Sequence, residues 1–198
     1  MRILHSLWPT RVGFTILLLV ELLGAGGVLP IKPEFTWKGM ILQSVAIWAF
    51  LELVRYLIDR HDFNMSLGPG ALLVLIQTAV DAVGDMGHLY GRFEWYDQIL
   101  HFSGGLMVAI VATALFRAIH EKQNHTIFPR AEIMVGGFGV AMAAQVLYEA
   151  EEYLEDVLTG SQRLGDGFDT ANDLVLGLFG AVLGALIVVV LPKLTAKR

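Results

Sequence analysis

Long apolar runs alternate with short polar connections along the whole chain. Each run is near the roughly 20 residues that a helix needs to cross the hydrocarbon core of a bilayer. The pattern predicts an all-α, polytopic membrane bundle of six transmembrane helices. The predicted spans cover residues 12–29, 38–58, 67–87, 97–119, 131–154 and 170–192.

The composition supports a membrane protein and limits the other classes. Of 198 residues, 55% are apolar and only 17% are charged, and the mean hydropathy is +0.60. Six spans leave no room for a separate soluble domain, so residues 1–198 are expected to form a single transmembrane helical domain. Membrane lipid is the expected partner, and nothing in the sequence indicates nucleic acid. The chain has no cysteine, which excludes disulfides and thiolate metal sites.

The distribution of Lys and Arg predicts the orientation. Cytoplasmic loops carry an excess of these residues. One side has ten of them, and the other side has four. The ten are Arg2, Arg11, Arg55, Arg60, Arg117, Lys122, Arg130, Lys193, Lys197 and Arg198, and the four are Lys32, Lys38, Arg92 and Arg163. Both termini are therefore expected in the cytoplasm, and the connection before the last span is expected to face outward.

Glycines and two isolated acids within the spans have structural interpretations. Gly177, Gly180 and Gly184 in the last span have the spacing that lets helices approach closely in lipid, so we interpret them as a packing surface. Glu52 can pair with Arg55 one turn later. Glu21 has no evident partner in the sequence.

Acids and histidines gather near one end of the last four spans. Helical spacing places each set on one face of its helix. The four sets are Asp81, Asp85 and His88; Asp97 and His101; Gln145, Glu149, Glu152 and Asp156; and Asp166, Asp169 and Asp173.

The depths of these side chains agree with one another. At about 1.5 Å per residue, Asp85 and Glu149 lie roughly 27 Å from the cytoplasmic edge. His101 and Asp173 start from the other side and lie about 6 Å below the outer edge. All four sets are therefore expected in one layer just under the external surface.

So many carboxylates in a low-dielectric setting need a compensating charge. A divalent metal ion can supply it, and so can protons shared in a water-filled cavity. Asp, Glu and His ligands suit Zn, Mn or Fe, whereas an all-oxygen subset suits Mg or Ca. The predicted metal ligands are Asp97, His101, Glu149, Glu152, Asp169 and Asp173, with Asp81 and His88 as further candidates.

Several of these acids have other interpretations. Asp85 or Asp166 is the expected general base of a metal-dependent reaction. Asp97 and Asp169 lie at helix starts and can act as N-caps. Glu155 and Asp156 are expected to form a solvated helix end.

The polar segments resemble a known family. "HLYGRFEWYDQILHFSGG", "YEAEEYL" and "GDGFDTANDLVLGLFGA" are similar to the YjdF-like bacterial inner-membrane proteins and, more distantly, to the VanZ-like family associated with glycopeptide resistance. The resemblance covers residues 80–185. Glu152 and Asp173 stand where the VanZ-like pattern usually has Gln and Asn. The resemblance implies a polytopic protein of the bacterial inner membrane with a polar centre, and no established reaction.

Three functions fit the sequence. The first is a metal-dependent hydrolase or transferase that acts on a lipid or lipid-linked headgroup at the outer face. The second is a cation- or proton-coupled transporter, because acids within a membrane often mark an ion path. The third is a non-catalytic membrane protein in which the polar core holds the helices together.

Overall fold

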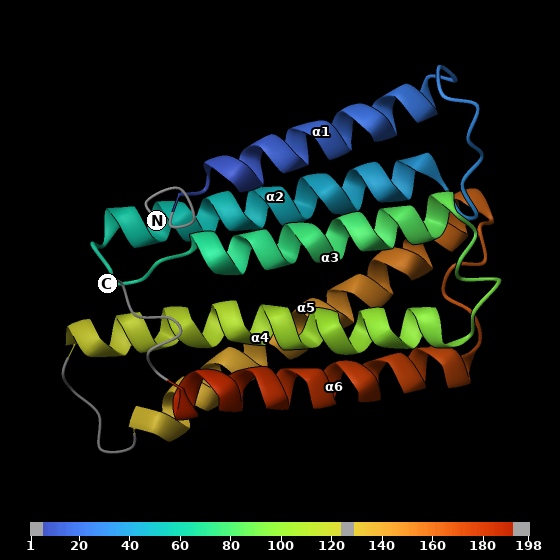
Figure 1. Ribbon diagram of the computed structural model, residues 1–198. Coiled ribbons are helices and arrows are strands. Elements are labelled where there is room, and N and C mark those ends of the chain that lie inside the picture. The colour runs from blue at the N-terminus through green and yellow to red at the C-terminus, as the bar shows by residue number, and fades with distance from the viewer. Residues whose placement is uncertain (1–5, 124–128, 192–198) are drawn as a thin grey trace.

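The computed structural model describes residues 6–123 and 129–191 and is all-α over these residues (Figure 1). Every helix in it is long and apolar enough to cross a membrane. This confirms the predicted bundle of six helices. The helices are α1 (Trp8–Ala25), α2 (Trp37–Arg60), α3 (Gly68–Met86), α4 (Trp95–Gln123), α5 (Pro129–Thr159) and α6 (Gly167–Val190).

Helix ends differ from the predicted spans where local signals override the apolar run. α1 begins four residues early because Pro9 suits a first helical turn, and it ends before Gly27, whose φ is +72°. α5 extends five residues beyond residue 154 and has 31 residues. A helix of that length measures about 46 Å and exceeds the bilayer core. It runs obliquely behind α4 (Figure 1).

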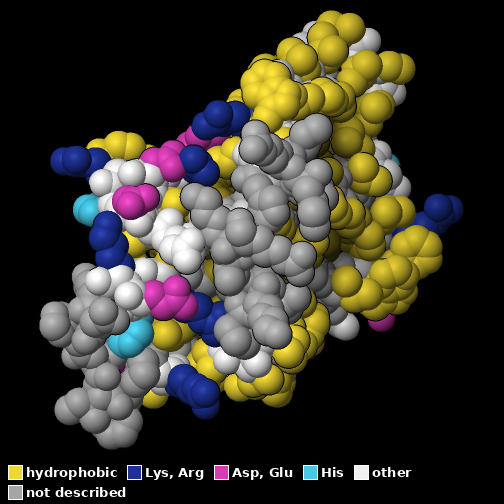
Figure 2. Space-filling view, turned by 60° about the vertical axis from the view of Figure 1, so that its left-hand side comes forward, with side chains coloured by type: hydrophobic (Ala, Val, Ile, Leu, Met, Phe, Trp, Pro, Cys, Tyr) yellow, Lys and Arg dark blue, Asp and Glu magenta, His cyan; other side chains and the backbone are white. Residues whose placement is uncertain are grey.

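The bundle has two chemically different ends. We call the end formed by the start of α1 and the ends of α2 and α4 the basic end, and the opposite end, with the α1–α2, α3–α4 and α5–α6 connections, the acidic end (Figure 1). Figure 2 shows Lys and Arg at the basic end, with Asp, Glu and His side chains among them, beside an apolar flank. The predicted orientation of the termini stays a prediction. Four of its residues lie outside the described ones: Arg2, Lys193, Lys197 and Arg198.

Helices α4 and α6 touch through their backbones. A Cβ on Gly180 would lie 2.0 Å from the carbonyl oxygen of Phe102, and one on Gly184 would lie 2.4 Å from that of Leu106. Gly105 of α4 makes the same kind of contact with the carbonyl of Gly177. The interpretation of these glycines as a packing surface is therefore confirmed. The contact fixes the two helices in one register.

Apolar side chains fill the rest of the interior. Phe14, Leu51 and Leu67 are almost fully buried where α1, α2 and α3 meet. Ala109, Ala141 and Ala181 pack together where α4, α5 and α6 meet. Small alanine side chains let these three helices lie close below the polar layer of the acidic end.

The two isolated acids have partners on neighbouring helices. Glu52 pairs with Arg11 of α1 and not with Arg55, which pairs with Asp59, so the predicted Glu52 pair is wrong. The reason is that α1 packs against α2 and places the Arg11 guanidinium 2.7 Å from the Glu52 carboxylate. Glu21 is fully buried and accepts a hydrogen bond of 2.8 Å from Ser44.

The α4–α6 contact predicts a stability difference between two glycines. Gly180→Ala places a methyl group against the Phe102 carbonyl, so we expect a loss of about 1–3 kcal/mol, as for other overpacked sites. Gly139→Ala in α5 is the matched control because, apart from the backbone of its own helix and its chain neighbours, no heavy atom lies within 4 Å of its new Cβ. Thermal unfolding in detergent measures both. Equal melting temperatures for the two variants would contradict this packing.

Candidate functional site

The first cluster at the acidic end surrounds the imidazole of His101 on α4. Its Nε2 lies 3.4 Å from Asp97 Oδ1 and 3.9 Å from Asp173 Oδ2. Its Nδ1 lies 3.5 Å from Glu149 Oε1 on α5. Two overlapping groups therefore share this imidazole, Asp97–His101–Asp173 and His101–Glu149–Glu152, and each brings its ligand atoms within 4.8 Å of one another. We call these residues the His101 cluster.

Several polar atoms of the His101 cluster lack hydrogen bonds although they are buried. Both carboxylate oxygens of Glu149, Oδ1 of Asp173 and Nδ1 of His101 have no hydrogen-bond partner. The exposed fractions of these three residues are 7%, 3% and 4%. A buried carboxylate without a partner costs stability unless another group compensates it. The cluster is therefore incomplete as a hydrogen-bond network.

Neighbouring side chains hold His101 in place. Gln145 donates a hydrogen bond of 2.8 Å from Nε2 to the His101 carbonyl oxygen. The ring of Tyr148 packs edge-on against the imidazole, with 5.4 Å between the ring centroids. α4 begins at Trp95, so Asp97 lies within its first turn and faces His101 one turn later.

An open hollow lies at the start of α6, beside the His101 cluster. Its volume is about 500 Å³, and it is lined by Asp166, Phe168, Asp169 and Asn172. Asp166 is the N-cap of α6 and accepts from the backbone N–H groups of Phe168 and Asp169. The N-cap of α6 is therefore Asp166 and not Asp169, which the sequence had suggested. Asp169 is exposed and close enough to Asp97 and His101 for electrostatic interaction.

A second cluster surrounds the guanidinium of Arg163, which the α5–α6 connection inserts into the bundle. Arg163 Nε lies 3.1 Å from Glu152 Oε1. Its terminal nitrogens lie 3.7 Å from Asp81 and 3.9 Å from Glu155. It also donates a hydrogen bond of 2.7 Å to the Tyr148 hydroxyl. Only 2% of the Arg163 side chain is exposed, so this is a buried ion-pair network.

The loop that carries Arg163 is tightly held. One carboxylate, that of Asp156, accepts from the Ser161 hydroxyl and from the backbone N–H groups of Arg163 and Leu164. Backbone φ is positive at Gly160, Gln162 and Gly165. The remaining partners of the cluster are Tyr90 and Gln43, which donate to Asp81, and Thr36, which donates to Glu155.

The electrostatics of the loop groups follow from these contacts. Burial alone lowers the pKa of Arg163, but the surrounding Tyr148, Asp81 and Glu152 raise it well above its ordinary value. The guanidinium is therefore a permanent positive charge. Burial raises the pKa of Tyr90 well above its usual range, and the carboxylate of Asp81 raises it further. The Tyr90 phenol is therefore a hydrogen-bond donor and not a base.

The structure separates the predicted site residues into groups. Asp97, His101, Glu149, Glu152 and Asp173 come together, with Asp169 at the mouth, whereas Asp81 lies in the Arg163 cluster. Asp85 accepts a hydrogen bond of 2.8 Å from the Phe35 backbone and so holds the α1–α2 connection. His88 is exposed in a turn with a φ of +54°. No contact described among residues 6–123 and 129–191 joins Asp85, His88 or Asp166 to His101.

The sequence interpretation missed the Arg163 cluster. Glu155 was expected in a solvated helix end, but it is buried beside Arg163 and Thr36, so that expectation is wrong. α5 tilts toward α2 and brings Glu155 against Gly39. Tyr148 had a detectable signal, since it is an aromatic residue beside Glu149 on a polar helix segment. The insertion of Arg163 depends on loop geometry, and no sequence signal indicated it.

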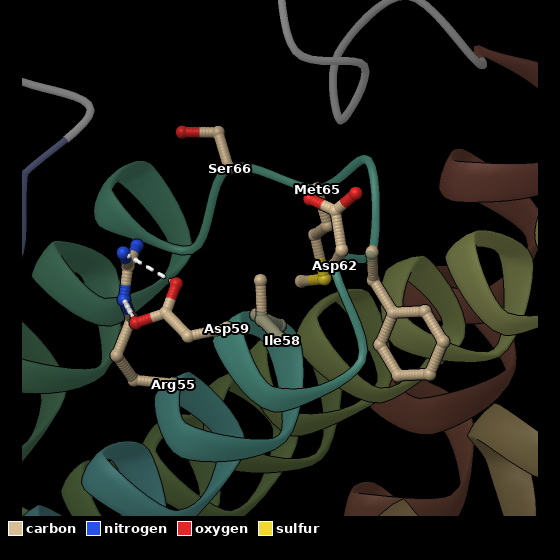
Figure 3. A pocket seen from close by; sticks show the side chains of 7 residues that line it. Arg55, Ile58, Asp59, Asp62, Met65 and Ser66 are labelled. Atoms are coloured by element: carbon tan, nitrogen blue, oxygen red, sulfur yellow. Dashed lines mark hydrogen bonds and ion pairs between the residues drawn. The ribbon is translucent and has the colours of Figure 1, made fainter.

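A hollow at the basic end has a different character. Figure 3 shows it beside the α2–α3 connection, where the Arg55 guanidinium and the Asp59 carboxylate point toward each other. Its volume is about 120 Å³, and the Arg55–Asp59 pair has a shortest distance of 2.6 Å. These charges satisfy each other on one helix. The hollow therefore does not share the unsatisfied character of the His101 cluster.

The unpartnered carboxylates predict an unusual stability effect. Asp173→Asn removes one buried negative charge, so in protein treated with a chelator at pH 8 we expect a melting temperature that is unchanged or higher by a few degrees. Arg163→Gln is the opposite case, because it leaves several buried carboxylates without a cation and is expected to cost about 3–5 kcal/mol. Differential scanning fluorimetry in detergent compares them. A sharp destabilisation by Asp173→Asn would indicate a purely structural network.

Comparisons with known proteins place the chain in a family. A comparison with curated proteins and with solved structures found no match. No match links the chain to the VanZ-like proteins. The model of the family described as "Predicted membrane protein (DUF2238)" matches residues 11–193, which is nearly the whole chain. This polytopic chain, with its six apolar helices and its buried group of acids and histidine, therefore belongs to that family of membrane proteins.

Proposed function

We propose that the His101 cluster binds a divalent metal ion and that the protein is a metal-dependent hydrolase or transferase. The substrate would be a lipid or lipid-linked headgroup at the outer face of the membrane. A divalent ion bound there supplies a Lewis acid for attack on an ester or phosphoryl group. The residues of this chain hold the ion, orient the imidazole and keep the buried side of the site dry.

The distances around His101 Nε2 carry this proposal. At 3.4 and 3.9 Å, the Asp97 and Asp173 oxygens are too far from Nε2 for good hydrogen bonds. Two atoms that each lie about 2.1 Å from a tetrahedral ion are themselves about 3.4 Å apart. The Asp97 oxygen lies at this spacing from Nε2, and the Asp173 oxygen lies somewhat farther away, so a bound ion could reach all three side chains. One imidazole with two carboxylates suits Zn, Mn or Fe better than Mg.

The access route supports a substrate that approaches from the membrane surface. Asp97 is the partly exposed member of the group, and Asp169 lines the neighbouring open hollow. Phe168 lines the same hollow with 87% of its surface exposed, and aromatic side chains, chiefly Trp and Tyr, are enriched at the level of lipid headgroups. An exposed ring beside charged ligands suits a headgroup whose acyl chains stay in the bilayer. Asp169 is placed to act as a base at this mouth.

The packing below the cluster favours an enzyme over a transporter. Ala109, Ala141 and Ala181 are completely buried, and Val108, Phe138 and Met142 pack around them. Ala109 is two helical turns, about 12 Å, below His101 on α4. A cation or proton path would have to cross this apolar layer. The proposed site therefore opens toward the acidic end.

Metal binding tests the proposal directly. The full-length protein in mild detergent, incubated with Zn²⁺ or Mn²⁺ and desalted, is expected to retain the ion in elemental analysis. His101→Ala and Asp173→Asn remove ligands, so the affinity should fall at least about tenfold, since loss of a mere hydrogen-bond partner of a ligand already costs that much. Glu94→Gln, an exposed acid of the same end, is the matched control and should bind like the wild type.

The enzymatic part has its own readout. Wild-type protein with bound metal, mixed with a bacterial lipid extract, should release headgroups that mass spectrometry detects, and His101→Ala should not. Metal-free wild type after incubation would contradict the metal site. Uptake of radioactive Zn²⁺ or Mn²⁺ into proteoliposomes would contradict the enzyme and favour transport.

We also infer the location and orientation of the chain. The match covers all of residues 80–185, which carry the YjdF-like resemblance, and this supports a YjdF-like protein of the bacterial inner membrane. The cations at the basic end support a cytoplasmic position for that end. The acidic end and its site would then face outward.

Single cysteines test this orientation because the chain has none of its own. Val28→Cys lies in the α1–α2 connection and is 67% exposed, so a membrane-impermeant maleimide should label it in intact spheroplasts. Glu121→Cys is exposed near the end of α4 and should react only after permeabilisation. The reverse labelling pattern would place the site in the cytoplasm.

A further inference from the structure

The His101 imidazole has carboxylates on both sides, and the two sides differ. Nε2 faces Asp97 and Asp173, next to the exposed Asp169. Nδ1 faces Glu149, with Glu152 close by, and both of these are buried on α5. Judged by ligand type alone, each side could hold a divalent ion. The structure therefore raises the question of how many ions bind.

The guanidinium of Arg163 already supplies a positive charge to the carboxylates on the Nδ1 side. Its Nε–H donates to Glu152 at 3.1 Å, which is an ordinary hydrogen-bond length, unlike the longer distances around His101. The guanidinium also lies over the rings of Phe35 and Tyr148, at 5.3 and 5.7 Å from their centroids. Arg cannot be deprotonated in a protein, so this charge is permanent.

The loop keeps this charge in place. Asp156 accepts hydrogen bonds from the backbone N–H groups of Arg163 and Leu164, which lie on the two sides of the Arg163 Cα. Just after it, Gly165 has a φ of +69°, and a Cβ there would lie 2.0 Å from Asp169 Oδ2. The same short connection thus fixes both the guanidinium and the acid at the mouth. Arg163 is part of the bundle interior and not a pendant surface side chain.

We propose that Arg163 replaces a second metal ion, so that the His101 cluster holds one ion, on the Nε2 side, with Asp97 and Asp173. This inference rests on the proposed metal site. A divalent ion on the Nδ1 side would lie beside a buried guanidinium, and like charges at such distances in a low dielectric repel strongly. Glu149 then has another role: its carboxylate faces Nδ1 of His101, with Oε1 at 3.5 Å, and so orients the ring for metal binding through Nε2.

The proposal assigns different roles to three acids of similar burial. Asp173 is a ligand, and Glu149 is a positioning residue that acts through His101. Glu152 is the ion-pair partner of Arg163. Loss of Glu152 should therefore leave metal affinity within about threefold of the wild type, because no ligand and no partner of a ligand is lost. Loss of Glu149 should reduce it by about 10–100-fold, the usual effect of removing a side chain that orients a ligand.

The test counts Zn²⁺ and Mn²⁺ ions per chain by elemental analysis after desalting, on the full-length protein in detergent. One ion is expected in the wild type, in Arg163→Lys and in Arg92→Gln, an exposed outer-side control. Arg163→Gln removes the fixed charge and is expected to bind a second ion. If Arg163→Gln does not fold, isothermal titration with Zn²⁺ compares the affinities of Glu152→Gln and Asp173→Asn. Near wild-type affinity in Glu152→Gln and a large loss in Asp173→Asn are then the expected results.

The outcomes separate this inference from the function on which it rests. Two ions in the wild type, or a loss of affinity in Glu152→Gln as large as that in Asp173→Asn, would overturn the role of Arg163 and leave the metal site standing. No ion in the wild type and none in Arg163→Gln would overturn both. One ion in the wild type and two in Arg163→Gln would support both.

Discussion

The backbone contact between α4 and α6 is the constraint on which the rest of the structure depends. Apolar side chains gain little by meeting one another in lipid, so helices associate where small residues let backbones approach. Gly180 and Gly184 meet the carbonyls of Phe102 and Leu106 and fix the register of the two helices. His101 directly precedes Phe102 in α4, so this register also brings Asp173 of α6 to the level of His101. A slip of one helical turn would move the acid by about 5.4 Å and abolish the cluster.

Charge compensation is the second organising feature of the acidic end. The acids there belong to two groups that share Glu152, and only one group has a built-in cation. In the Arg163 cluster, short hydrogen bonds and aromatic rings surround the charge. In the His101 cluster, oxygens of Glu149 and Asp173 lack hydrogen-bond partners. Glu155 Oε2 in the Arg163 cluster also lacks a hydrogen bond, but it lies 3.9 Å from the guanidinium. A fold that places a fixed cation in one buried acidic group and none in its neighbour is expected to bind a cation at the second.

The features that were predictable from the sequence are those that depend on local spacing. Long apolar runs predict the helices, and steps of three and four residues predict which acids share a face. The helical rise per residue, counted from opposite membrane edges, also places His101 and Glu149 at one depth. The features that could not be predicted depend on helix crossing and loop conformation. The Arg11–Glu52 pair joins two helices, and the burial of Glu155 results from the tilt of α5. The inward path of Arg163 needs a positive φ at Gln162, for which the residue type gives no warning.

Direct localisation of the ion is the measurement that tests the central claim, namely that separate helices aim these ligands into one site. A crystal of the full-length protein grown with Mn²⁺ or Zn²⁺, with anomalous diffraction data, would show the ion itself. The expected result is one anomalous peak per chain, about 2.0–2.2 Å from His101 Nε2 and from oxygens of Asp97 and Asp173. Peaks elsewhere, or a map in which these three side chains point apart into bulk water or lipid, would contradict the account.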